Sequence, residues 1–156
     1  MRAWVLGDNV DTDVIVPGRY MKFGIEEIAK HCLEAINPEF STLVEHGDVV
    51  VAGRNFGAGS SREQAPAALK HLGIAALIAE SFAGLFYRNA LNLGLPALVC
   101  PAAKRIQDGE ALSIDLEGAS IRRQNGEVVS FERIPPHLME MVRDGGLLAH
   151  LEKRRK

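Results

Sequence analysis

The residues with the clearest chemical potential are Ser60, Ser61 and Arg62, which end a loop that is rich in glycine. Gly57 and Gly59 let the backbone approach a ligand closely and adopt positive φ angles. A helix that starts after such a loop offers unpaired N–H groups and a partial positive charge, which together attract anions. The guanidinium of Arg62 can grip a carboxylate or phosphate with two hydrogen bonds. We therefore interpret the stretch as an anion-binding loop.

A structural interpretation of the two serines is also open, because Ser60-x-x-Glu63 and Ser61-x-x-Gln64 both have the spacing of a capping box. In that interpretation at least one serine caps the following helix. Pro66 lacks an N–H in the second turn and is expected to delay the start of regular structure. The sequence therefore leaves open which serine caps and which one is free.

Several other kinds of site are excluded by inspection. The loop lacks the lysine of a phosphate-binding G-x-x-x-x-G-K-[ST] motif, and Ser60 and Ser61 are not followed by the glycine of a G-x-S-x-G nucleophile motif. The five histidines have no metal-ligand spacing. Cys32 and Cys100 lie far apart without a C-x-x-C spacing, so neither a disulfide framework nor a metal site is indicated in this chain.

The elements that must position this loop are predicted from hydrophobic patterns. The fold class expected is a three-layered α/β domain with a parallel or mixed sheet and a β-rich C-terminal part, and Asn125-Gly126 is a strong hairpin signal there. A short amphipathic helix is expected after Pro135-Pro136. Strands are predicted at 2–6, 49–52, 74–79, 95–100, 111–116, 119–123 and 128–131, and helices at 25–36, up to about 72, and at 82–93.

Composition limits the class of protein and of partner. The chain has 156 residues, of which 47% are hydrophobic and 24% charged, as expected of one compact domain with a real core. The net charge is −2, and acidic and basic residues are mixed along the chain. This pattern indicates binding to neither nucleic acid nor an anionic membrane. No apolar run approaches the roughly 20 residues that span a bilayer, and the N-terminus has no cleavage site. A cytoplasmic location is expected.

Three separated motifs carry a family resemblance. They occur in the order Asp8-Asn9-Val10-Asp11-Thr12-Asp13, then Asn55-Phe56-Gly57-Ala58-Gly59-Ser60-Ser61-Arg62-Glu63, then Ser81-Phe82-Ala83-Gly84-Leu85-Phe86-Tyr87-Arg88-Asn89. Together they resemble the small subunits of the 3-isopropylmalate dehydratase family, which correspond to the swivelling domain of aconitase. The resemblance implies a single swivelling β/β/α domain over residues 1–156.

The resemblance also implies a division of chemistry between two chains. In this family a large subunit holds a [4Fe–4S] cluster through three cysteines, and one iron binds the substrate. The present chain would carry no cofactor of its own. Ser60 matches the family's general base, Ser61 and Arg62 would hold a carboxylate of a small carboxylic acid, and Asp13 would be a supporting acid or hydrogen-bond acceptor. For Asp11 a turn held by side-chain hydrogen bonds is an equal alternative.

The substrate is less well defined by the resemblance. Tyr20, Met21 and Lys22 match the loop with which related small subunits choose their substrate. An isopropyl group would favour an apolar residue at the third position, and homoaconitate would favour arginine, so Lys22 fits neither cleanly. The expected function is isomerisation of isopropylmalate in leucine biosynthesis. The alternatives are a homoaconitase or a dimethylmalate or maleate hydratase subunit, and, in another class, a non-catalytic anion-binding module.

Overall fold

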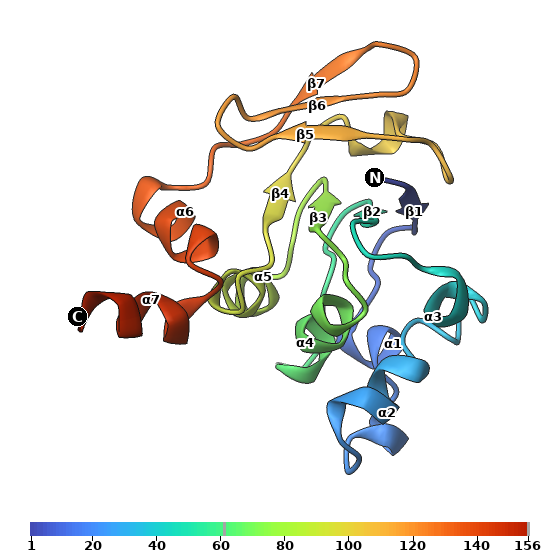
Figure 1. Ribbon diagram of the computed structural model, residues 1–156. Coiled ribbons are helices and arrows are strands. Elements are labelled where there is room, and N and C mark those ends of the chain that lie inside the picture. Colours follow the sequence, from blue (N-terminus) through green and yellow to red (C-terminus); the bar gives the residue numbers. More distant parts are fainter. Residues whose placement is uncertain (61, 156) are drawn as a thin grey trace.

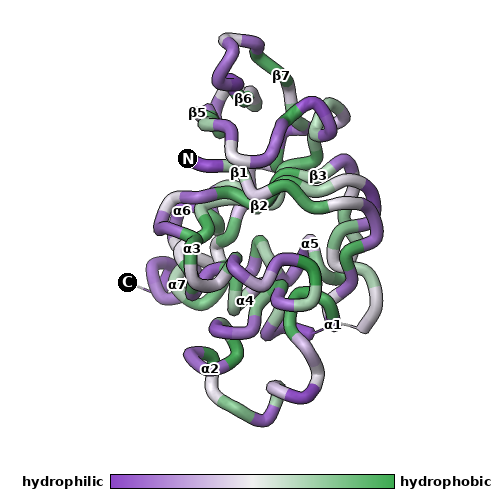
Figure 2. Tube along the Cα trace, turned by 90° about the vertical axis from the view of Figure 1, so that its right-hand side faces the viewer, coloured by the Kyte–Doolittle hydropathy of each residue, from purple (hydrophilic) through white to green (hydrophobic). Residues whose placement is uncertain are grey.

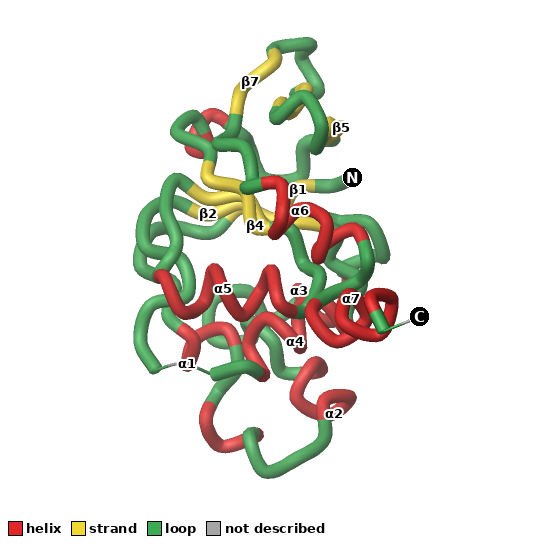
Figure 3. The backbone as a smooth tube through the Cα atoms, turned by 90° about the vertical axis from the view of Figure 1, so that its left-hand side faces the viewer, coloured by secondary structure: helices red, strands yellow, loops and turns green. Residues whose placement is uncertain are grey.

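The computed structural model describes residues 1–60 and 62–155, and these residues form three layers (Figure 1). A parallel sheet lies in the middle, helices cover one of its faces, and a smaller antiparallel sheet lies on its other side (Figure 3). This arrangement confirms the predicted three-layered α/β class. The strands are β1 (Ala3–Val5), β2 (Val49–Ala52), β3 (Ala76–Ala79), β4 (Ala97–Val99), β5 (Ser113–Asp115), β6 (Ser120–Arg122) and β7 (Val128–Ser130).

The helices connect the strands of the parallel sheet and then close the chain. Because β1, β2, β3 and β4 are neighbours in sequence order and all run parallel, right-handed connections place the intervening helices on the same face of the sheet. The helices are α1 (Thr12–Ile15), η1 (Gly18–Tyr20), α2 (Ile25–Lys30), α3 (Phe40–Leu43), α4 (Gln64–His71), α5 (Gly84–Asn92), η2 (Ala103–Arg105), α6 (Pro136–Arg143) and α7 (Leu147–Arg154).

The core of the molecule follows the two central strands. Every residue of β2 and β3 is buried, as expected of strands that are covered on both faces. Figure 2 shows hydrophobic residues gathered along these strands and hydrophilic residues on much of the outer turns. Phe86 of α5 and Leu69 of α4 are buried against the sheet, and Trp4 packs edge-on against Phe40 with ring centroids 5.2 Å apart. The helices therefore carry the loops on a rigid base.

The antiparallel strands form a sheet of their own. β5 pairs with β6 and β6 pairs with β7, and the predicted hairpin turns at Asn125 and Gly126, where Gly126 has a φ of +91°. Arg123 forms an ion pair of 3.1 Å with Glu110, and both side chains are at least 85% buried, with exposures of 12% and 8%. The predicted combination of parallel and antiparallel strands is thus present, divided between two sheets.

One predicted helix is shorter than expected. The helix predicted over 25–36 ends at Lys30 and is followed by turns. Leu33 has a φ of +60°, is fully buried, and donates its N–H to the carbonyl of Ile15 at 2.9 Å. A contact with α1 therefore takes the place of the continuing helix, and Leu33 lies in the core.

Candidate functional site

The site is built where the loops after β1, β2 and β3 meet. The N–H of Asn9 donates to the carbonyl of Arg54 at 2.8 Å, and the N–H of Phe56 donates to the carbonyl of Ser81 at 3.0 Å. Three motifs that are far apart in sequence therefore lie side by side at the carboxyl ends of parallel strands. Ligands of open α/β sheets bind at this edge.

The glycine loop exposes Ser60. Gly57 and Gly59 have φ angles of +84° and +94°, which other residues adopt only at a cost. A Cβ at Gly57 would collide with the ring of Phe86, so the loop also passes too close to α5 for any larger residue. Ser60 lies at the end of this turn and is exposed. This residue is therefore accessible to a ligand or to a docking surface.

The capping interpretation of Ser60 is wrong. The helix after the loop, α4, begins at Gln64, and its N-cap is Glu63, which makes no side-chain capping bond. Ser60 instead accepts the N–H of Arg62 at its carbonyl oxygen at 2.9 Å. Pro66 lies in the first turn of α4, where its missing N–H costs little. Ser61 lies outside the described residues.

Arg62 is held in place by the loop after β1. Its Nη1 donates to Asp13 Oδ1 at 2.8 Å and to the carbonyl of Val16 at 3.1 Å. Asp13 also accepts the N–H of Gly18 at 3.1 Å. The Arg62 guanidinium and then the Gly18 N–H hold the pKa of Asp13 below its ordinary value. Asp13 therefore anchors Arg62, and its role as a supporting acid or hydrogen-bond acceptor stays a prediction.

The orientation of Arg62 leaves part of its guanidinium available. Both donors of Nη1 are engaged, whereas Nη2 and Nε have no hydrogen-bond partner among residues 1–60 and 62–155. The side chain is 26% exposed, and that of Asp13 is 66% exposed. These free donors have the fork geometry that binds a carboxylate. The predicted association of Ser60, Arg62 and Asp13 is thus a structural fact, while their chemical roles stay predictions.

Thr12 belongs to this site, although its residue type alone did not single it out. It is 2% exposed, and its Oγ1 donates to the carbonyl of Ser60 at 2.8 Å and lies 3.5 Å from Ser60 Oγ. The available signal was its position between Asp11 and Asp13 in the first of the three motifs. Asp11 itself caps α1 by accepting the N–H of Val14 at 2.8 Å, as its turn interpretation predicts.

Gly18, which precedes the expected substrate loop, lies against the site. A Cβ at Gly18 would lie 3.3 Å from Arg62 Nη2, so the loop starts directly against the guanidinium. Tyr20 stacks on the ring of His31, with centroids 3.6 Å apart and planes 3° apart. The ammonium of Lys22 is exposed and lies 5.5 Å from the centroid of the Phe23 ring.

The middle of this loop is therefore held by its own neighbours. Met21 is partly buried, and its N–H donates to the carbonyl of Gly18 at 3.1 Å. The roles of Tyr20, Met21 and Lys22 toward a substrate stay predictions.

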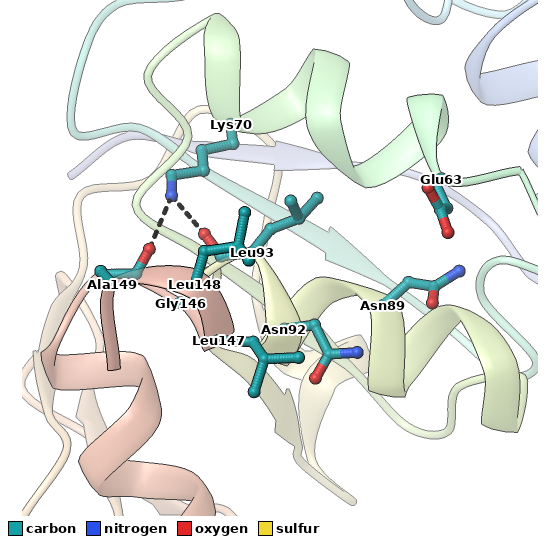
Figure 4. A pocket seen from close by; sticks show the side chains of 10 residues that line it. Glu63, Lys70, Asn89, Asn92, Leu93, Gly146, Leu147, Leu148 and Ala149 are labelled. Atoms are coloured by element: carbon teal, nitrogen blue, oxygen red, sulfur yellow. Dashed lines mark hydrogen bonds between the residues drawn. The ribbon is translucent and has the colours of Figure 1, made fainter. Parts of the chain in front are cut away.

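A groove of about 370 Å³ between α4, α5 and α7 is separate from these residues (Figure 4). Its lining includes Glu63, Leu93 and Leu148 and, among the residues that the structure describes, contains none of the predicted site residues. Lys70 donates to the carbonyls of Leu93 and Gly145 here, so it ties the start of α7 to the end of α5. The groove is accounted for by the packing of the helices.

The ligand chemistry of the chain is limited. Within residues 1–60 and 62–155, no group of three or more His, Cys, Asp or Glu side chains could hold a metal ion. Cys32 and Cys100 are buried free thiols, and burial raises the pKa of both. In the same described residues, no helix combines the length and the apolar character that crossing a membrane requires.

Comparison with known proteins places the whole chain in one group. The model of the aconitase C-terminal domain matches residues 24–103. A methanogen homoaconitase small subunit from Methanothermobacter thermautotrophicus is 50% identical over 154 residues, which cover 97% of this chain and 89% of that protein. The 3-isopropylmalate dehydratase small subunit 1 of Methanopyrus kandleri is 47% identical, with 97% and 91% covered.

A solved structure has the same fold throughout. The crystal structure of 3-isopropylmalate dehydratase from Methanocaldococcus jannaschii matches with a TM-score of 0.94 at 44% identity. The match covers 99% of this chain and 93% of that one. The likeness therefore extends well beyond the three motifs that first indicated it.

Proposed function

The chain belongs to the aconitase C-terminal domain family, and from this premise we propose that it is the small subunit of a 3-isopropylmalate dehydratase. It interconverts 2-isopropylmalate and 3-isopropylmalate by removing and re-adding water, in leucine biosynthesis. The observation that carries the proposal is the exposed residue Ser60, presented by a glycine turn beside Arg62, whose Nη2 and Nε have no partner among residues 1–60 and 62–155 and suit a carboxylate. The names of the relatives support the same reaction.

The residues of this chain have separate tasks in the reaction. Arg62, oriented by Asp13, binds a substrate carboxylate through Nη2 and Nε, with Ser61 as a second ligand of that carboxylate. Ser60 takes the proton from the carbon next to that carboxylate. A serine base requires its negative charge to be stabilised, and the permanent charge of Arg62 supplies part of that field. Gly57 and Gly59 give the loop the shape that presents Ser60.

The site needs a second polypeptide. Ser60 lies on an open surface, where water would compete with every charged contact, and a docked partner would exclude that water. We infer that this partner is a large subunit with a [4Fe–4S] cluster, which would act as Lewis acid on the departing hydroxide. The two thiols of this chain are buried and separate, so they do not fit a cluster of its own. Free thiols also fit a protein that works in the reducing cytoplasm.

The experiment is to purify the chain with its large subunit and to follow the absorbance of the unsaturated acid. Ser60→Ala is expected to lower kcat by at least about a hundredfold, because it removes the general base. Ser41→Ala is the matched control, since it removes another serine hydroxyl, which donates to the carbonyl of Lys30 at 2.7 Å, away from the site. An assembled complex that is indifferent to Ser60→Ala would contradict catalysis and favour a non-catalytic anion-binding module.

A second candidate substrate is homoaconitate, which has one more carboxylate. The exposed ammonium of Lys22 on the substrate loop favours it, as does a homoaconitase small subunit that is 50% identical. Lys22→Ala would then raise KM for homoaconitate while sparing isopropylmalate, whereas the exposed Lys30→Ala should change neither. Equal effects of Lys22→Ala on both substrates would argue against a carboxylate contact.

A further inference from the structure

The buried residue Thr12 supports the exposed residue Ser60 through its hydroxyl. Thr12 lies directly beneath the end of the glycine loop, and its Oγ1 is 2.8 Å from the Ser60 carbonyl oxygen and 3.5 Å from Ser60 Oγ. We propose that Thr12 is a positioning residue that fixes both the backbone and the hydroxyl of Ser60 for proton transfer. The inference rests on the proposed function of Ser60 and goes beyond it, because it assigns a role to a residue that cannot touch the substrate.

The single proton of the Thr12 hydroxyl decides how the two contacts work. The shorter contact is to a carbonyl oxygen, which can only accept, so Thr12 donates there. In the longer contact the donor is then the neutral Ser60 hydroxyl, and Thr12 Oγ1 accepts. This contact describes Ser60 after proton transfer: the Ser60 oxygen, negatively charged before the step, has taken the proton from the substrate carbon and now donates it to Thr12 Oγ1.

The surroundings of Thr12 keep its hydroxyl from moving. Thr12 is 2% exposed, and its N–H donates to the carbonyl of Ala58 at 2.8 Å. Gly59 lies beside it, since a Cβ there would be 3.6 Å from Thr12 Oγ1, at ordinary contact distance. A β-branched side chain also has few χ1 rotamers, so threonine holds its oxygen more firmly than serine would. Thr12 is thus a rigid support under residues 58–60.

Thr12 belongs to α1, and this four-residue helix also orients the side chain of Arg62. Asp11 caps α1, Thr12 contacts Ser60, and Asp13 binds Arg62, so three successive residues have three different partners. A shift of α1 would move the predicted base and the predicted carboxylate-binding group together. This coupling explains how the loop after β1 can matter to a reaction carried out by the loop after β2.

The test is a double-mutant cycle in the complex with the large subunit. Thr12→Val keeps the shape and removes the hydroxyl, and we expect kcat to fall about ten- to a hundredfold, the cost of a misplaced reacting group. KM should change by less than about twofold, because Thr12 does not bind substrate. Thr12→Ser should recover most of kcat. In a Ser60→Ala background, Thr12→Val should lower kcat no further.

Three results would overturn the inference in distinguishable ways. If Ser60→Ala leaves kcat unchanged, the proposed function fails and the role of Thr12 fails with it. If Ser60→Ala lowers kcat but Thr12→Val does not, only the role of Thr12 is wrong. If Thr12→Val lowers kcat equally with and without Ser60, Thr12 acts on the structure alone. Gel filtration of each variant complex ensures that equal amounts of assembled enzyme are compared.

Discussion

Gly57 offers the sharpest test of the loop geometry. It combines a φ of +84° with a backbone so close to α5 that a Cβ would collide with the ring of Phe86. Gly47 is a matched control, because its φ is +96° and a Cβ there would meet nothing within 4 Å. Comparing Gly57→Ala with Gly47→Ala therefore separates the steric collision from the backbone strain.

The two contributions have different sizes. An alanine in the left-handed region costs roughly 1–2 kcal/mol, and this applies to both positions. Overpacking a buried site adds about 1–3 kcal/mol, and this applies only at Gly57. Gly57→Ala should therefore lower the free energy of unfolding by about 2–5 kcal/mol, out of the roughly 5–15 kcal/mol typical of a domain. The entropy that alanine removes from the unfolded chain is common to both variants and cancels in the comparison.

The assay is urea unfolding of both variants of the isolated chain, followed by activity of the Gly57→Ala variant in the complex. We expect Gly57→Ala to be less stable than Gly47→Ala and to have a lower kcat per assembled complex, because Ser60 follows directly in the same loop. Equal unfolding free energies for the two variants would refute the close approach to Phe86. A destabilised variant with unchanged kcat would refute the dependence of Ser60 on the loop's shape.

Two further predictions concern charged groups. Asp48 is 6% exposed and accepts the indole N–H of Trp4 at 3.0 Å. Asp48→Ala should therefore lower the free energy of unfolding, measured in urea, by about 1–3 kcal/mol. A decrease of less than about 0.5 kcal/mol would contradict a contribution of that bond to stability. Hydrogen bonds hold the pKa values of Asp8, Asp13 and Asp144 below their ordinary value. The stability that these three carboxylates give the folded chain is therefore complete above the unfolded pKa and is lost as the pH falls below about 4. Urea midpoints should therefore be flat between about pH 7 and 5. A fall within that range would point to other groups.

The sequence by itself determined the elements whose patterns are local. The apolar runs at 49–52 and 74–79 became the buried central strands β2 and β3, and Asn125-Gly126 became the turn between β6 and β7. These patterns succeed because side-chain periodicity and turn preferences depend on neighbours in the chain. The three motifs also identified the family before any contact was known, since their residue types and order are properties of the sequence alone.

Only the tertiary structure decided which residues act together. Asp13 and Arg62 are 49 positions apart, and Thr12 and Ser60 are 48 apart, yet each pair is in contact because β1 lies beside β2. The same packing ended α2 early at Lys30 and left Ser60 uninvolved in capping α4. The physical reason is that strand order and loop approach arise from burying the whole core, and no short stretch of sequence specifies them.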